Sequence, residues 1–271
     1  MPLGMIAGNG RFPVLALEAA RAAGLEVVVI GIKEEASSEI EPLAAHCHWI
    51  SLGAFSKLID ICHQEGITQV MMCGQVKHAK IFSAIVPDLR LVKLLASIET
   101  KNTEGLIGAV MKVLKDEGIE LVDSTLLLKD LLAPAGVLTR RKPSADEQRD
   151  MEYGRRIAAA LSEHDIGQSI AVADRACVAV EAMEGTDAML RRAASLVEGK
   201  PLRLVKASRR RRHMLYDVPV VGPQTIAVMR ETGATALAID AGRTLMLDQA
   251  ETLRQADAAQ ITIAAQAIPY S

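Results

Sequence analysis

Three carboxylates lie close together in the second half of the chain, at Glu181, Glu184 and Asp187. Carboxylates suit Mg²⁺, and a bound Mg²⁺ can orient a water molecule for attack on a phosphate. Thr186 or Asp187 can cap the helix expected to follow, with Glu184 near its N-terminus and Arg191 one turn beyond Asp187. The same pattern is typical of an ordinary helix start with an i,i+4 ion pair, so the residues alone leave both interpretations open.

A basic run and a lone acid follow. Six of the ten residues from Arg203 to Arg212 are Lys or Arg, which gives a local field suited to phosphate or to an anionic membrane surface. Asp217 comes five residues later, where these cations would neutralise a pyrophosphate beside it. A solvated basic strand end and a simple Asp-x-Pro turn are the structural alternatives.

Two glycine-containing turns follow predicted strands in the first half. The turn Gly8-Asn9-Gly10 leads to Pro13 and a helix whose first N–H groups can hold phosphate or uridine polar atoms. The second turn, Gly74-Gln75-Val76-Lys77, follows a buried strand at the edge where open α/β sheets bind ligands, so it can face the same crevice. Pro13 replaces the third glycine of GxGxxG, and no acid is seen ending the second strand, which disfavours NAD.

The elements that position these residues alternate between short apolar runs and helical patterns, which is typical of βαβ units. The fold class is therefore α/β, with an amino-terminal Rossmann-like parallel-sheet domain plus a second α/β domain. A Pro-Gly break at residues 133–136 places the domains at 1–133 and 134–271. Strands are expected at 3–7, 26–32, 48–52, 69–73 and 120–123, then at 202–206, 236–239, 244–247 and 261–265, with a hairpin at 170–182. Helices are expected at 13–23, 55–64, 89–98, 103–117, 144–161, 186–196, 225–232 and 249–258.

Composition excludes several classes of function. The 271 residues carry a net charge of −2 and include three Phe, three Tyr and one Trp, too few aromatics for a base-stacking surface, so no nucleic-acid partner is expected. The apolar runs are shorter than the roughly 20 residues of a membrane span, and no secretory signal is seen, so a cytoplasmic protein is expected. The four cysteines lack a CxxC pair and are expected to be reduced thiols, and the His and Cys spacings fit no usual zinc pattern.

Taken together, these segments resemble the UDP-2,3-diacylglucosamine diphosphatase family of lipid A biosynthesis, in the two-domain form unrelated to calcineurin-like metallophosphoesterases. The most specific matches are Asp165-Ile-Gly-Gln168, Val180-Glu-Ala182, Glu184-Gly-Thr-Asp-Ala-Met-Leu-Arg-Arg192, Lys206 and Asp217-x-Pro219-x-x-Gly222-x-x-Thr225. The chain departs from the family pattern at Leu215, where relatives often carry arginine, and at Thr103, within a segment that is Gly-Asp-Asp in relatives.

The resemblance implies hydrolysis of UDP-2,3-diacylglucosamine to 2,3-diacylglucosamine 1-phosphate and UMP, with Mg²⁺ as cofactor and Mn²⁺ as an alternative ion. It implies a UDP-binding domain at 1–133, a catalytic and lipid-binding domain at 134–271, a homodimer, and transient contact with the inner face of the cytoplasmic membrane. The expected catalytic residues are Asp217, Lys206, Glu184 and Asp187, and the metal ligands are Asp217, Glu184 and Asp187. The expected substrate-binding residues are Gly8, Asn9, Gly10, Pro13, Gly74, Gln75, Lys77, Gln168, Glu181, Thr186, Arg191, Gly222 and Thr225.

Two other classes of function stay open at this point. A nucleotide-sugar or NAD-binding oxidoreductase would need a ribose-binding acid near the second strand. A non-enzymatic protein would use Arg209 to Arg212 to bind RNA or an anionic membrane surface, with an affinity that falls steeply with salt.

Overall fold

The computed structural model describes residues 2–76, 87–98, 103–209, 214–216 and 218–268. The chain forms two compact units. The first contains Met1–Leu128 and His213–Tyr216, and the second contains Lys129–Arg212 and Asp217–Ser271. The chain therefore leaves the first unit after Leu128, contributes four more residues to it at 213–216, and continues in the second unit from Asp217.

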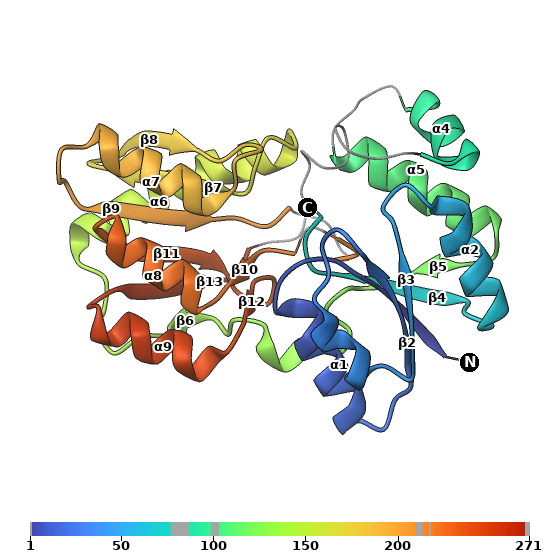
Figure 1. Ribbon diagram of the computed structural model, residues 1–271. Coiled ribbons are helices and arrows are strands. Elements are labelled where there is room, and N and C mark those ends of the chain that lie inside the picture. The colour runs from blue at the N-terminus through green and yellow to red at the C-terminus, as the bar shows by residue number, and fades with distance from the viewer. Residues whose placement is uncertain (1, 77–86, 99–102, 210–213, 217, 269–271) are drawn as a thin grey trace. The chain divides into compact units, whose positions relative to one another are not determined.

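The first unit is built on a five-stranded parallel sheet with the strand order β3-β2-β1-β4-β5 (Figure 1). Its strands are β1 (Leu3–Ala7), β2 (Val27–Ile32), β3 (His46–Ile50), β4 (Gln69–Cys73) and β5 (Glu120–Leu121). Every residue of β2, Val-Val-Val-Ile-Gly-Ile, is buried, as expected for a parallel strand covered on both faces. The predicted Rossmann-like parallel sheet is confirmed.

Helices cover both faces of this sheet. α2 (Phe55–Gln64), α4 (Leu89–Ala96) and α5 (Thr103–Asp116) pack with Ile6, Val28 and Ile30 in one apolar cluster. On the other face, α1 (Phe12–Ala22) buries Phe12, Val14 and Leu17, and the short 3-10 helix η1 (Ser38–Leu43) lies against α1. Alternate residues of β1 thus point to opposite faces of the sheet. This alternation fixes the register of β1 with its neighbouring strands.

The second unit contains a mixed six-stranded sheet with the order β6-β13-β11-β9-β7-β8. Its strands are β6 (Gly136–Val137), β7 (Ser169–Ala173), β8 (Ala176–Val180), β9 (Leu202–Lys206), β11 (Ala234–Asp240) and β13 (Thr262–Gln266). β9, β11 and β13 run parallel, whereas β6, β7 and β8 each pair in the antiparallel sense. A separate pair, β10 (Val220–Val221) and β12 (Leu245–Met246), is parallel.

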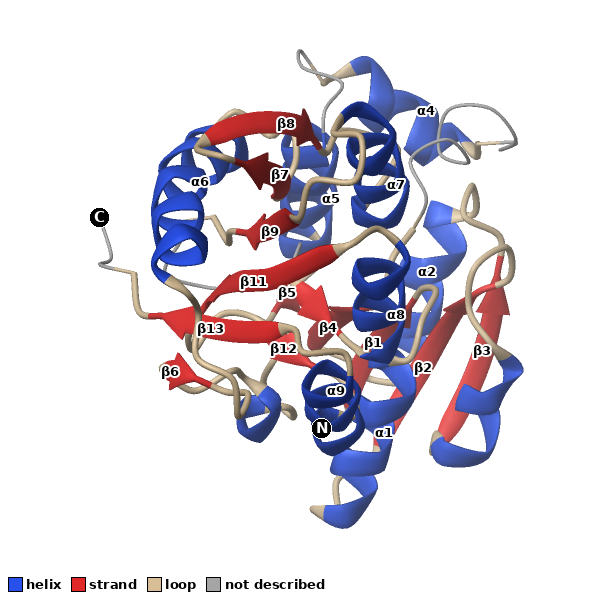
Figure 2. Cartoon of the chain, turned by 90° about the vertical axis from the view of Figure 1, so that its left-hand side faces the viewer, coloured by secondary structure: helices blue, strands red, loops and turns tan. Residues whose placement is uncertain are grey.

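One long helix covers one face of this sheet, and three shorter helices cover the other (Figure 2). α6 (Ala145–Glu163) packs on Ile170, Val172 and Val205. α7 (Thr186–Leu196), α8 (Pro223–Glu231) and α9 (Gln249–Ala258) pack on the alternate residues, among them Leu204 and Leu237. The predicted second α/β domain is confirmed.

Local sequence signals account for several boundaries. The Ser144 hydroxyl accepts from the Glu147 amide at 3.2 Å, and the Glu147 carboxylate accepts from the Ser144 amide at 2.8 Å, which is the predicted capping box. Asp174 and Arg175 both have positive φ, as a two-residue hairpin turn requires. The sequence did not predict β6, β10, η1 or the 3-10 helix η2 (Lys129–Leu131), because two to six residues are too few to show a period.

Candidate active site

The two glycine turns of the first unit lie side by side at the carboxyl ends of β1 and β4. The Gly8 amide donates to the Cys73 carbonyl at 2.8 Å, and Asn9 and Gln75 exchange two backbone hydrogen bonds of 2.7 and 3.0 Å. In this strand order, the neighbours β1 and β4 continue to opposite sides of the sheet, and ligands bind at such a switch point. The structure thus brings the two predicted turns together.

Glycine is required here because the two backbones approach each other closely. A Cβ on Gly8 would lie 2.7 Å from the Gln75 carbonyl oxygen, and a Cβ on Gly74 would lie 2.6 Å from the Asn9 carbonyl oxygen. Gly74 also has a φ of +89°, which side chains rarely adopt. The amides of Gly8, Asn9 and Gln75 are used in this pairing, so a phosphate would have to meet the beginning of α1 instead.

The beginning of α1 has no side-chain cap. Arg11 occupies the N-cap position and Pro13 lies in the first turn, where its missing N–H costs nothing. Gly10, with a φ of +99°, is exposed, and no atom lies within 4 Å of the place of its Cβ. The uncapped amides of the first turn therefore leave an anion-compatible position above the glycine turn.

Glu35 lies beside this turn, close to the end of the second strand. It follows β2 by three residues, is only 7% exposed, and its carboxylate accepts from the Asn9 side-chain amide at 3.4 Å. The second strand itself ends without an acid, at Ile32, as predicted, but the chain turns back after Ile32 and brings Glu35 to the edge of the sheet. The adjacent pair Glu34-Glu35 was the available signal. Lys77 lies outside the described residues.

The predicted residues of the second unit include one tight polar cluster. The Thr186 hydroxyl lies 3.2 Å from Lys206 Nζ, 3.1 Å from Ser169 Oγ and 3.0 Å from Glu181 Oε1. Ser169 and Lys206 are paired neighbours on β7 and β9, Glu181 directly follows β8, and Thr186 begins α7. Lys206, Glu181 and Thr186 were expected to act in the site. Ser169, which carries no motif signal, was missed.

Backbone contacts hold this cluster together. The Ala207 amide donates to the Gln168 carbonyl at 2.8 Å, and the Glu181 amide donates to the Ser169 carbonyl at 2.9 Å. The Oε2 atom of Glu181 is buried and has no hydrogen-bond partner among the described residues. A buried carboxylate oxygen without a donor is costly, so the cluster retains unused capacity to accept a hydrogen bond.

The other predicted acids do not join this cluster. Glu184 forms an ion pair with Arg192 and accepts from the Ala182 amide at 3.1 Å. The hydrogen bond from Arg192 lowers the pKa of Glu184 below its usual value. Asp187 accepts at 3.5 Å from the Gln224 side chain. The Glu184 carboxylate is therefore engaged in an ion pair with Arg192.

The beginning of α7 differs from the prediction in both its N-cap residue and the ion pair of Arg191. Gly185 occupies the N-cap position without a side-chain cap, so neither Thr186 nor Asp187 is the cap. Arg191 donates to Glu231 on α8 at 2.8 and 2.9 Å, and the structure gives it no ion pair with Asp187. The hydrogen bonds to Glu231 raise the pKa of Arg191. Glu231, the bidentate partner of Arg191, lies on another helix and far away in the sequence. The i,i+4 spacing rule applies only within one helix, so it does not predict this pair.

Gly222 and Thr225 shape the beginning of α8. The Thr225 hydroxyl accepts from the Gly222 amide at 3.4 Å, with Gly222 at the N-cap position and Pro223 after it.

Asp217 and Arg210 to Arg212 lie outside the described residues, and so does the side chain of Thr103. Leu215 packs against the apolar core of the first unit.

The described acids do not by themselves fit a magnesium site. No group of three or more His, Cys, Asp or Glu side chains positioned to hold a metal occurs in the part of the chain that the structure describes.

In the first unit, His46 and His48 both contact Glu65, at 2.8 and 2.7 Å. The hydrogen bond to Glu65 raises the pKa of His46.

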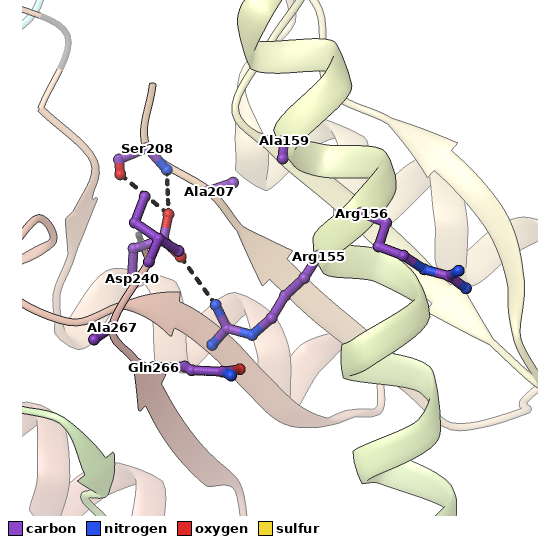
Figure 3. Close-up of a pocket in the computed structure, with 9 residues that line it drawn as sticks. Arg155, Arg156, Ala159, Ala207, Ser208, Asp240, Gln266 and Ala267 are labelled. Atoms are coloured by element: carbon purple, nitrogen blue, oxygen red, sulfur yellow. Dashed lines mark hydrogen bonds and ion pairs between the residues drawn. The ribbon is translucent and has the colours of Figure 1, made fainter. Parts of the chain in front are cut away.

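A cavity of about 160 Å³ opens at the carboxyl ends of β9, β11 and β13, on the face covered by α6. Figure 3 shows Arg155 pointing from α6 toward Asp240, which also accepts from the Ser208 amide and hydroxyl at 2.6 and 3.1 Å. The Arg155–Asp240 ion pair measures 2.9 Å. Arg243 donates to the Ser208 hydroxyl at 2.9 Å and to the Arg209 carbonyl at 2.5 Å. This network fixes the backbone just beyond Lys206.

Comparison with known proteins identifies the family. The model described as the LpxI N-terminal domain matches residues 2–131, and the model described as the LpxI C-terminal domain matches residues 134–264. The chain belongs to the LpxI family. A curated relative from Caulobacter vibrioides (strain ATCC 19089 / CIP 103742 / CB 15), the UDP-2,3-diacylglucosamine pyrophosphatase LpxI, is 31% identical over an alignment of 265 residues that covers 94% of this chain and 94% of the relative.

Two solved structures resemble the chain weakly. A UDP-glucose-4-epimerase from Stenotrophomonas maltophila is 14% identical, covers 96% of this chain and 98% of its own, and has a TM-score of 0.33. The biotin carboxylase subunit of a pyruvate carboxylase is 13% identical with a TM-score of 0.27 over 73% of this chain, which spans only 42% of that subunit. These scores are too low to support an argument. The predicted LpxI-type resemblance is confirmed by the domain models and the curated relative.

Proposed function

We propose that the protein hydrolyses the pyrophosphate of UDP-2,3-diacylglucosamine, giving 2,3-diacylglucosamine 1-phosphate and UMP in lipid A biosynthesis. The observation that carries this proposal is the match of both LpxI domain models along the chain, together with a curated pyrophosphatase that is 31% identical over 94% of both chains. The enzyme is accordingly a hydrolase of a phosphoric anhydride.

The chemistry assigns different tasks to the two units. Water adds to one phosphorus, the bridging P–O bond breaks, and negative charge develops on the phosphoryl oxygens. In the second unit, Lys206 stabilises that charge from the end of β9. In the first unit, the edge formed by Gly8, Asn9 and Gly74 binds the uridine nucleotide, and the beginning of α1 meets a phosphate.

Asp217 belongs to this proposal by family resemblance, as the group that aligns the water or holds Mg²⁺. Mg²⁺, or Mn²⁺ in its place, would supply charge neutralisation at the pyrophosphate. Glu184 is committed to Arg192 in the structure, which favours Asp217 over Glu184 as the ligand. The described residues alone do not hold such an ion.

The substrate joins a soluble nucleotide to two acyl chains, so the enzyme meets the inner face of the cytoplasmic membrane without entering it. Among the described residues, no helix has the length and apolar character needed to cross a bilayer. Homodimerisation and peripheral membrane contact are parts of the proposal, which includes no nucleic-acid partner. The presence of Glu35 gives the oxidoreductase alternative its missing acid, but the family match favours hydrolysis.

The experiment that tests this function uses the purified full chain with UDP-2,3-diacylglucosamine in detergent, with Mg²⁺ or with EDTA. Mass spectrometry is expected to find UMP and 2,3-diacylglucosamine 1-phosphate with Mg²⁺ and neither product with EDTA. Absence of turnover by folded protein with any divalent metal would overturn the proposal. Turnover undiminished by EDTA would overturn the metal requirement alone.

We expect Glu35→Gln to weaken UDP binding about tenfold. A carboxylate near the end of the second strand can accept both ribose hydroxyls, and hydrogen bonds to a charged group are worth about 1.5–3 kcal/mol. Titration calorimetry with UDP and with 2′-deoxy-UDP measures this, and the substitution should affect 2′-deoxy-UDP less. The neighbouring Glu34→Gln is the control, because Glu34 accepts from the Leu52 amide instead. Equal loss for both nucleotides would argue against ribose contact.

A further inference from the structure

The hydroxyl of Thr186 has three hydrogen-bond partners, and its single proton fixes their direction. A threonine hydroxyl donates once and accepts up to twice. Lys206 Nζ can only donate, and Thr186 donates to Glu181 Oε1. The Ser169 hydroxyl, 3.1 Å away, must therefore be a donor to Thr186. The Thr186 hydroxyl then uses its one donor and both acceptor positions. The hydrogen bonds run from the Lys206 ammonium to Thr186 and from Thr186 to the Glu181 carboxylate.

Lys206 depends on this hydroxyl for its position. Thr186 is the hydrogen-bond partner that the structure gives its ammonium within the described part of the chain. A lysine side chain is a flexible four-carbon stem that carries a compact charge, so packing alone fixes its end poorly. An ammonium has three donors, and the bond to Thr186 leaves two of them to meet phosphoryl oxygens.

Thr186 is itself held rigidly. It is the first residue of α7, and its partners come from the paired β7 and β9 strands and from the residue after β8. Both oxygens of the Glu181 carboxylate lie within the structure, since Oε1 accepts from Thr186 and Oε2 is buried. Three elements thus determine where the Lys206 charge lies.

We propose that Thr186 is a positioning residue that fixes the ammonium of Lys206 for charge stabilisation at the pyrophosphate. This inference rests on the proposed function and gives Thr186 and Glu181 a role different from substrate binding. Thr186 touches no reacting atom in this scheme. It acts through Lys206, so its loss should lower the rate of the chemical step more than it weakens substrate binding.

The first test compares Thr186→Val, which keeps the shape and removes the hydroxyl, with Thr186→Ser, which keeps the hydroxyl. Thr186→Val should lower kcat about 10–100-fold, because a misplacement of about 1 Å can cost that much, while KM changes less than about threefold on the same reasoning. Thr186→Ser should retain kcat within about threefold. Thr232→Val removes another buried hydroxyl, which donates to the Val228 carbonyl, and should leave kcat unchanged.

The second test is a double-mutant cycle with Lys206→Met, which separates positioning from a general structural effect. If Thr186 acts through Lys206, adding Thr186→Val to Lys206→Met should lower kcat by no more than about twofold. Full additivity, a loss confined to KM, or a Ser variant as impaired as the Val variant would each overturn the inference. An active wild type with an unaffected Thr186→Val enzyme overturns only this inference, whereas an inactive wild type overturns the proposed function with it.

Discussion

Asp217→Asn is expected to lower the rate of UDP-2,3-diacylglucosamine hydrolysis about 1,000-fold, the loss expected when a charge that organises a phosphoryl-transfer site is removed. Asparagine preserves the size of the side chain and removes its negative charge. An amide neither holds Mg²⁺ as a carboxylate does nor aligns the attacking water through a negative charge. The initial rate of UMP release by the full chain measures the effect.

The residues around Asp217 are well anchored, so the substitution should act on chemistry and not on folding. Tyr216 packs against the apolar core of the first unit, and the Pro219 carbonyl accepts from the Leu245 amide at 2.9 Å in the second unit. Asp130→Asn is a matched control, because Asp130 is exposed on η2, and it should keep full activity. Activity of Asp217→Asn within tenfold of the wild type would remove Asp217 from the reaction.

Much of the fold could be predicted because it is determined by local patterns. A few neighbouring residues are enough to explain each of three features. These are the buried run of β2, the capping box at Ser144 and the hairpin turn at Asp174-Arg175. The position of both glycine turns also followed from topology, because parallel strands end at one edge of the sheet. These features need no knowledge of distant contacts.

The site was harder to predict because its partners are far apart in the sequence. Thr186 was expected to be a cap or a substrate ligand; it is not the cap, and it joins Ser169 and Lys206, which lie 17 and 20 residues away. Glu184, which was expected to bind metal, forms an ion pair with Arg192 that its position in the sequence did not predict. Spacing along a helix or strand predicts which residue types are near an edge. It does not predict which carboxylate keeps a free oxygen once the side chains have paired.

The largest effect on stability is expected from Arg155→Met, which removes the cation beside Asp240 in the second unit. The Asp240 side chain is only 3% exposed and that of Arg155 18% exposed. Burial lowers the pKa of Arg155, and the neighbouring carboxylate opposes this shift. Without Arg155, the buried Asp240 carboxylate keeps its hydrogen bonds from Ser208, whose hydroxyl also accepts from Arg243, but loses its direct ion pair. Breaking such a pair typically costs about 3–5 kcal/mol of unfolding free energy.

Arg191→Met is the matched control, because the same substitution breaks an ion pair of similar length, 2.8 Å to Glu231, between side chains that are 47% and 54% exposed. It should leave stability nearly unchanged, because water screens an exposed pair. The single tryptophan, Trp49, lies in the first unit, so its fluorescence does not report on the second. Hydrogen exchange followed by peptide mass spectrometry does, and β9 and β11 amides should exchange much faster in Arg155→Met. Equal protection in the two variants would mean that Ser208, together with the Arg243 bound to its hydroxyl, is enough to stabilise Asp240 without Arg155.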